Sequence, residues 1–166
     1  MLLTGAVMGL ALNQLDARAQ QRGGTQPIAA RAGEIVGYAR IIDGDTVEID
    51  GHRIRFPGID APERRQACGG APVGQMATAA LERITAGKRL VCAPRGADDY
   101  GRTLADCRAD GESVSARLVR EGWAMDYPRF SGGRFALAQF QAQTAGRGLW
   151  AHQCLAPWTW RRLNSL

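Results

Sequence analysis

Residues 41–63 read I-I-D-G-D-T-V-E-I-D-G-H-R-I-R-F-P-G-I-D-A-P-E, and this stretch organises the rest of the chain. Apolar and polar residues alternate over 46–50 and again over 52–57. A period of two is the pattern of half-buried β-strands. Asp50-Gly51 lies between the two runs, and Asp-Gly is the dipeptide that a type I′ hairpin turn favours. The stretch therefore predicts a β-hairpin whose two ends lie close together.

Four acidic residues lie at the ends of this hairpin: Asp43 and Asp45 before it, and Asp60 and Glu63 after it. Arg55 stands between the two groups in the sequence. Carboxylate oxygens without histidine or cysteine favour Ca²⁺ or Mg²⁺ over zinc. A guanidinium beside such a cation is suited to an anionic substrate such as a phosphate. The same acids have a simpler interpretation, in which they cap turns or pair with neighbouring arginines.

Composition sets the size and the charge of the protein. The chain has 166 residues, of which 45% are hydrophobic, and this suits one domain with a sizeable core. Its net charge of +5 and its pI of about 9.5 favour a polyanionic partner such as nucleic acid. Many basic proteins bind no nucleic acid, so charge alone does not establish this partner.

The N-terminal residues 1–19 are typical of a secretory signal peptide. An apolar run covers 2–12, and Ala17-Arg18-Ala19 is a small-x-small cleavage site, although the positive n-region is missing. The run is shorter than the roughly 20 apolar residues that span a bilayer. We expect cleavage after Ala19, a secreted or periplasmic mature protein and a flexible linker over 20–33. The alternative is an N-terminal extension that is retained.

Four cysteines, an even number, suit an oxidising compartment. Cys92 and Cys107 lie in two adjacent strand-like runs, so we expect them to pair and to leave Cys68 with Cys154. A zinc site is the alternative. It is disfavoured because the sequence has no Cys-x-x-Cys spacing.

The remaining pattern predicts a small α+β domain over 34–152 and an uninterpreted C-terminal tail over 153–166. Ser113 is a candidate N-cap, and Gly87 and Gly122 are candidate helix stops. Five strands with about three helices suggest a five-stranded OB-fold β-barrel, a fold that often binds oligonucleotides. The expected strands are 34–42, 46–50, 52–57, 88–92 and 102–108, and the expected helices are 75–86, 113–121 and 135–145.

Four motifs in order resemble the staphylococcal nuclease (thermonuclease) family. They are D-G-D-T at 43–46, R-F-P-G-I-D-A-P-E at 55–63, D-D-Y-G-R-T-L-A at 98–105 and L-V-R-E-G-W-A at 118–124. The similarity extends from about residue 37 to 150. It implies an OB-barrel nuclease that hydrolyses DNA and RNA with Ca²⁺ and without strong sequence specificity. Family members cleave the 5′ P–O bond and leave 3′-phosphate ends.

The resemblance also implies roles for the acidic residues. Asp45 and Asp60 match metal ligands, and the backbone carbonyl of Ala61 matches a third. Glu63 matches the acid that positions or deprotonates the attacking water. Ala61 stands where the best-known member has threonine, which is tolerable if only the carbonyl binds the metal.

The resemblance assigns Arg55 and Arg102 to phosphate binding, and it places Tyr100 at the nucleotide pocket. Tyr127 is a candidate for a second pocket tyrosine, although its spacing is one residue short. Asp99 replaces a lysine that touches the terminal phosphate in the best-known member, so binding of a phosphate end is expected to be weaker.

A noncatalytic OB-fold module that binds nucleic acid or a protein is the alternative function. Such a module would be expected to lose the metal ligands or the arginines, and this chain keeps both. We expect a monomer that acts on DNA and RNA, with no membrane insertion of the mature chain.

Overall fold

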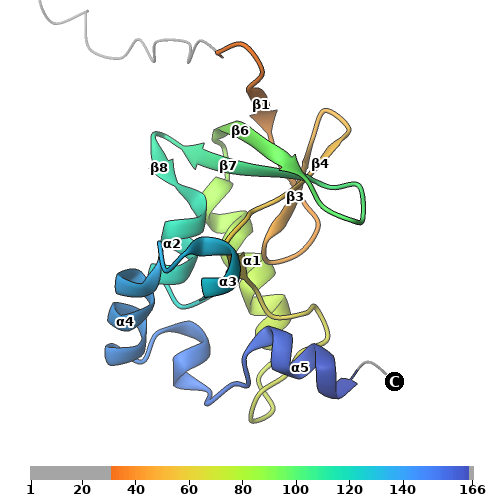
Figure 1. Ribbon diagram of the computed structural model, residues 1–166. Coiled ribbons are helices and arrows are strands. Elements are labelled where there is room, and N and C mark those ends of the chain that lie inside the picture. The colour runs from red at the N-terminus through yellow and green to blue at the C-terminus, as the bar shows by residue number, and fades with distance from the viewer. Residues whose placement is uncertain (1–30, 165–166) are drawn as a thin grey trace, which may run out of the picture.

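The structure, a computed structural model, describes residues 31–164. The predicted signal peptide and most of the predicted linker lie outside these residues. Figure 1 shows the labelled strands gathered at one end of the molecule, with α4 (Ala136–Thr144) and α5 (Pro157–Asn164) towards the other end. No helix within residues 31–164 is long and apolar enough to cross a membrane.

The predicted hairpin is confirmed. Strands β3 (Thr46–Ile49) and β4 (His52–Arg55) pair antiparallel in the expected register. Asp50 and Gly51 have φ angles of 48° and 79°, which is the left-handed conformation that both central residues of a type I′ turn require. The alternation buries Val47, Ile49 and Ile54 on one face of the hairpin, and this face packs against the core.

The strands form one large sheet and one small sheet. The large sheet has the order β1-β6-β7-β4-β3-β2, and β8 pairs with β7. Its strands pair antiparallel except for β4 and β7, which are parallel. The small sheet pairs β5 with β9. The bounds are β1 (Ile35–Tyr38), β2 (Arg40–Ile41), β5 (Ile59–Asp60), β6 (Arg89–Ala97), β7 (Thr103–Ala109), β8 (Glu112–Ser113) and β9 (Met125–Asp126).

The predicted α+β class is confirmed, but the predicted counts of five strands and about three helices are wrong, and the large sheet is not a closed barrel. Residues 31–164 form an open seven-stranded sheet, a two-stranded sheet and five α-helices. The expected strand 34–42 is two strands because the chain changes partner at Ala39, from β6 to β3. The expected loop after Pro94 continues β6 to Ala97, across a register shift between Pro94 and Gly96.

Three predicted helices are present as α1 (Val73–Thr85), α2 (Val114–Arg120) and α4 (Ala136–Thr144). The Ser113 hydroxyl accepts a hydrogen bond from the Ala116 amide at 3.3 Å, so the predicted N-cap is confirmed. Three short elements were missed because they span only four to eight residues, which is too few for a periodic pattern. They are α3 (Pro128–Ser131), a 3₁₀ helix (Gly148–Ala151) and α5 (Pro157–Asn164).

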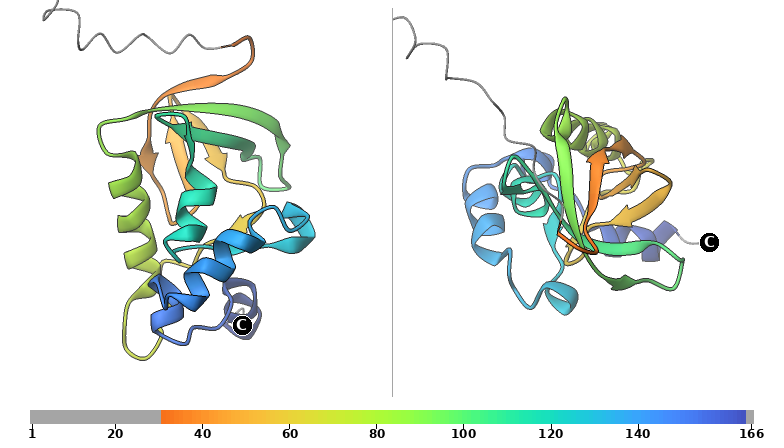
Figure 2. Two further views of the ribbon diagram at one scale, coloured as in Figure 1. Left: turned by 90° about the vertical axis from the view of Figure 1, so that its left-hand side faces the viewer. Right: turned by 90° about the horizontal axis from the view of Figure 1, so that it is seen from above.

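The main core lies between the sheet and the helices α1 and α2. Figure 2 shows both helices running from the sheet towards the end of the molecule that holds α4 and α5. A second, smaller cluster buries Cys68, Val73, Met125 and Leu149, and Trp158 packs against it. This second cluster attaches the C-terminal segment to the domain.

Both predicted disulfides are present. Cys92 and Cys107 face each other across β6 and β7, with a Cα–Cα distance of 4.0 Å. Cys68 and Cys154 have a Cα–Cα distance of 5.3 Å and join the loop after Glu63 to the C-terminal segment. The tail over 153–166 is therefore covalently attached next to the predicted site.

Candidate active site

Two of the predicted acids meet at the base of the hairpin. Asp45 immediately precedes β3, and Asp60 ends the short strand β5. The Asp45 carboxylate accepts hydrogen bonds from the Ala61 amide at 2.8 Å and from the Thr46 hydroxyl at 3.1 Å. Asp45 and Asp60 are both buried. The structure thus brings Asp45, Asp60 and Ala61 together, as the sequence predicted.

Arg55 connects the two buried acids. Its Nη1 lies 2.5 Å from Asp45 Oδ2, and its Nη2 lies 3.2 Å from Asp60 Oδ1. Nη2 also donates to the Ile59 carbonyl at 3.1 Å. The hairpin register places Arg55 opposite Thr46, which is the neighbour of Asp45. One guanidinium therefore stands at the centre of the candidate site.

Burial makes this site attractive to positive charge. Desolvation raises the pKa of Asp45 to about 7, and Arg55 opposes that rise while Asp43 and Asp60 add to it. Desolvation also raises the pKa of Asp60, against the opposing effects of Arg161 and Arg55. Buried carboxylates are stabilised as anions by any cation placed against them. The electrostatics of this site thus favour further positive charge.

Sequence reasoning missed Arg161, which lies in α5 and contacts two of the predicted site residues. Its Nη2 lies 2.7 Å from Asp60 Oδ2, and its Nη1 lies 3.0 Å from Asp60 Oδ1. Nη1 also donates to Glu63 Oε1 at 2.8 Å. The tail carries no periodic signal, so only the docked position of α5 shows that Arg161 belongs to the site.

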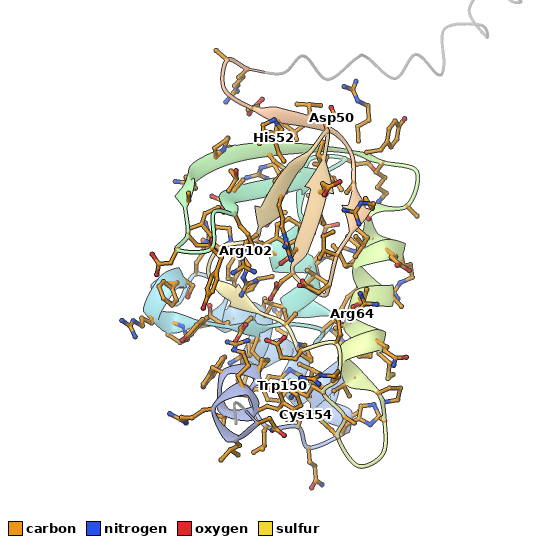
Figure 3. The ribbon with its side chains drawn as sticks, turned by 90° about the vertical axis from the view of Figure 1, so that its right-hand side faces the viewer. Asp50, His52, Arg64, Arg102, Trp150 and Cys154 are labelled. Atoms are coloured by element: carbon orange, nitrogen blue, oxygen red, sulfur yellow. A yellow bond between two sulfur atoms is a disulfide. The ribbon has the colours of Figure 1, made fainter. Side chains whose placement is uncertain are left out.

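Arg102 is not part of this cluster of contacts. Its Nε donates to Asp98 Oδ2 at 2.7 Å, and its guanidinium lies 5.5 Å from the centre of the Tyr100 ring. Tyr100 itself is 85% exposed. Figure 3 shows Arg102 midway between the hairpin tip, marked by Asp50, and the C-terminal segment, marked by Cys154. The phosphate role of Arg102 and the nucleotide role of Tyr100 stay predictions.

Tyr127 is covered on one face by the C-terminal helix. Its ring stacks on Trp158 with the centroids 5.0 Å apart and the planes 8° from parallel. Phe130 makes an edge contact with the same ring at 4.9 Å. The predicted nucleotide-binding surface of Tyr127 is therefore occupied by Trp158 in this structure.

The donors around Asp45 and Asp60 suit a hard cation by their chemistry. Two of them are the carboxylates of Asp45 and Asp60, and the resemblance implies the Ala61 carbonyl as a third, all oxygen ligands of the kind that Ca²⁺ prefers. Within residues 31–164, however, no three His, Cys, Asp or Glu side chains are already grouped as a metal site. The guanidiniums of Arg55 and Arg161 neutralise the acids instead.

An open depression of about 410 Å³ lies beside Glu63 and Arg161. Its other lining residues are Asp43, Arg64, Arg65, Trp160 and Asn164. The depression therefore combines the guanidiniums of three arginines and one indole with the two acids Asp43 and Glu63.

Comparison with known proteins agrees with the four sequence motifs. Residues 53–152 match the family described as "Staphylococcal nuclease homologue". The chain is 38% identical to the succinoglycan biosynthesis protein ExoI of Rhizobium meliloti, over 77% of this chain and 73% of that protein. It is 34% identical to an uncharacterized endonuclease of Escherichia coli O157:H7, over 74% of this chain and 81% of that protein.

A plant relative is much longer than this chain. The probable staphylococcal-like nuclease CAN1 of Oryza sativa is 37% identical over 86% of this chain, and the match spans 42% of the rice protein. The family match begins within β4 and contains Arg55, Asp60 and Glu63. By its sequence, this chain belongs to the staphylococcal nuclease family.

Proposed function

We propose that the protein is a Ca²⁺-dependent nuclease that hydrolyses DNA and RNA without strong sequence specificity. The observation that carries the proposal is the convergence of Asp45, Arg55 and Asp60, with Glu63 joined to Asp60 through Arg161. Two relatives support it by their names: the probable staphylococcal-like nuclease CAN1 is 37% identical to this chain, and an uncharacterized endonuclease is 34% identical. Acids that gather beside a guanidinium suit a reaction on phosphate esters.

The metal ligands in this proposal are Asp45, Asp60 and the carbonyl of Ala61. When bound, Ca²⁺ neutralises charge on a phosphoryl oxygen and lowers the pKa of a water molecule. Glu63 accepts the proton of the attacking water at its carboxylate. The side chain of Glu63 is 43% exposed, so water and substrate reach it directly.

The arginines and tyrosines position the substrate. Arg55 and Arg102 donate N–H groups to phosphate oxygens and stabilise the charge that develops there. The exposed Tyr100 holds a nucleotide by stacking or packing, which tolerates any base. The ring of Tyr127 is stacked on Trp158, so Tyr127 reaches a nucleotide only when that stack opens. We propose cleavage of the 5′ P–O bond, so that the products carry 3′-phosphate ends.

A digestion assay with a matched variant tests the proposal. Purified protein is incubated with plasmid DNA and with RNA in Ca²⁺, in Mg²⁺ or in chelator, and we expect cleavage with Ca²⁺ that chelator stops. The variant Glu63→Gln is expected to lower turnover about 10²- to 10⁴-fold while the fold is kept. The control is Glu34→Gln, whose half-buried carboxylate accepts from the Arg31 amide and from no member of the acidic cluster, and it should leave turnover unchanged.

Two outcomes of this assay count against the proposal. Cleavage that persists in chelator would contradict the metal role, and near-wild-type turnover of Glu63→Gln would remove Glu63 from the mechanism. Binding of nucleic acid without cleavage in any metal would instead identify a noncatalytic OB-fold module.

We also propose that the protein is exported and acts as a monomer. The two disulfides support an oxidising compartment. N-terminal sequencing of protein recovered from its final location should give Gln20, and recovery of Met1 would contradict export. Gel filtration should give the mass of a single chain.

A further inference from the structure

Arg161 occupies the positions that a cation would need at Asp60. Both oxygens of the Asp60 carboxylate accept from Arg161, and Oδ1 is also 3.2 Å from Arg55. The same guanidinium bonds Glu63, the proposed base. One side chain therefore engages a proposed metal ligand and the proposed general base at once.

The position of Arg161 is maintained by contacts on either side of it. Trp158 stacks on Tyr127 three residues before Arg161 in the sequence. The segment before α5 is joined to the domain by the Cys68–Cys154 disulfide, and Gln66 donates to the Leu155 carbonyl at 3.0 Å. The ion pairs of Arg161 thus belong to a docked helix and not to an isolated surface side chain.

We propose that Arg161 is a positioning residue of the active site that competes with Ca²⁺ for Asp60 and Glu63. In the metal-free protein, Arg161 of α5 supplies the positive charge beside Asp60 and Glu63. Ca²⁺ would bind only after the Arg161 guanidinium has moved away from these two carboxylates. This inference rests on the proposed function, because it assumes that Ca²⁺ binds at Asp60.

The contacts of Asp60 and the exposed position of Arg161 support the replacement of this guanidinium by Ca²⁺. Arg161 donates to both oxygens of the Asp60 carboxylate, so the oxygens that Ca²⁺ would need at Asp60 are already engaged, and charge repulsion adds to this competition. The Arg161 side chain is 40% exposed, and it lines the depression of about 410 Å³ that also contains Trp160 and Asn164. Arg161 can therefore leave the acids without crossing the core, and in the depression it is free to bind a substrate phosphate.

The expected size of the effect follows from the population of the released state. The apparent Kd of a ligand equals its intrinsic Kd divided by the fraction of protein that is competent to bind. Hydrogen bonds between charged groups are strong enough to keep that fraction at roughly 1–10%. Removal of Arg161 is therefore expected to lower the apparent Kd for Ca²⁺ by roughly 10- to 100-fold.

Calorimetric titration of the full mature chain with CaCl₂, without nucleic acid, tests the inference. Arg161→Gln removes the charge and should tighten Ca²⁺ binding by roughly 10- to 100-fold. Arg161→Lys keeps the charge but not the forked geometry and should give an intermediate Kd. The control is Arg120→Gln, which removes a guanidinium paired with Glu112 and should leave the Kd within about twofold of wild type.

A second variant tests the same inference without removing the arginine. Trp158→Ala removes the stack on Tyr127, which loosens α5, and should also tighten Ca²⁺ binding, by less than Arg161→Gln. Circular dichroism establishes that each variant is folded before titration.

The outcomes separate this inference from the proposed function. An equal or weaker affinity of Arg161→Gln would overturn the competition, and the nuclease proposal would stand if wild-type protein still cleaves with Ca²⁺. If neither protein binds Ca²⁺ and chelator leaves cleavage unchanged, both proposals fail.

Discussion

Gly74, in the first turn of α1, determines how closely that helix approaches the loop that contains Glu63. A Cβ atom at this position would lie 1.9 Å from the Glu63 carbonyl oxygen. The Gly74 amide also donates to the Gln66 carbonyl at 3.1 Å. The backbone at Gly74 therefore contacts the loop at both Glu63 and Gln66. The position of Glu63 thus depends on a residue that has no side chain.

Gly74→Ala is expected to destabilise the protein by about 1–3 kcal/mol, because the added methyl group forces the loop and the helix apart. It should also lower turnover, since the same displacement moves Glu63. Urea denaturation measures the first effect, and the digestion assay measures the second. The neighbouring exposed residue provides the control, Gln75→Ala, which should change stability by less than about 0.5 kcal/mol. Equal stability of the two variants would show that α1 does not press on the loop.

At the scale of the elements, α5 is the part of the structure that changes the interpretation of the site. It covers Tyr127 through Trp158 and contacts Asp60 and Glu63 through Arg161. A helix of eight residues is too short to be stable by itself in water, so its order depends on docking. The disulfide that precedes it keeps the helix close to its docking site.

Removal of that disulfide by Cys68→Ser with Cys154→Ser should release α5 from the domain. We expect faster trypsin cleavage at Arg161 and a loss of about 2–5 kcal/mol in the free energy of unfolding. Mass spectrometry of the digest and a denaturation curve are the two measurements. Cys92→Ser with Cys107→Ser is the matched control, which lowers stability but leaves Arg161 protected. The prediction is contradicted if both double variants are cut at Arg161 at the same rate.

At the scale of the whole molecule, the positive net charge attracts any polyanion, but binding through direct contacts requires particular arginines to bind phosphate groups. The chain has a net charge of +5, but many of its guanidiniums are paired with carboxylates, as Arg95 and Arg134 are with Asp106. Attraction by net charge and direct contact between an arginine and a phosphate therefore predict different effects of salt concentration on DNA affinity.

Binding of double-stranded DNA in chelator should weaken as salt rises, because each phosphate contact releases counterions. Arg102→Gln should reduce the slope of log K against log[salt] by about 0.9, the value for one lost phosphate contact. Arg120→Gln changes the net charge equally and should leave the slope unchanged. Fluorescence anisotropy across a salt series measures both, and identical slopes would show that Arg102 contacts no phosphate.

The features that the sequence alone determined are local. The period of two and Asp50-Gly51 specify the hairpin through dihedral preferences, and Ser113 specifies a helix start through one hydrogen bond to the Ala116 amide. The position of Cys92 and Cys107 in adjacent strands made their pairing predictable. The four motifs also predicted which acids belong to the proposed site, because they resemble those of the staphylococcal nuclease family.

The features that only the tertiary structure decided depend on distant contacts. Strand 34–42 divides because its two halves pair with different strands, and β5 pairs with β9 over only two residues. Arg161 lies 101 positions from Asp60, and neither residue carries a pattern that refers to the other. Periodicity and turn preference act over a few residues, whereas an ion pair between distant residues forms only when packing brings them together, which is why α5 and its arginine were not predicted.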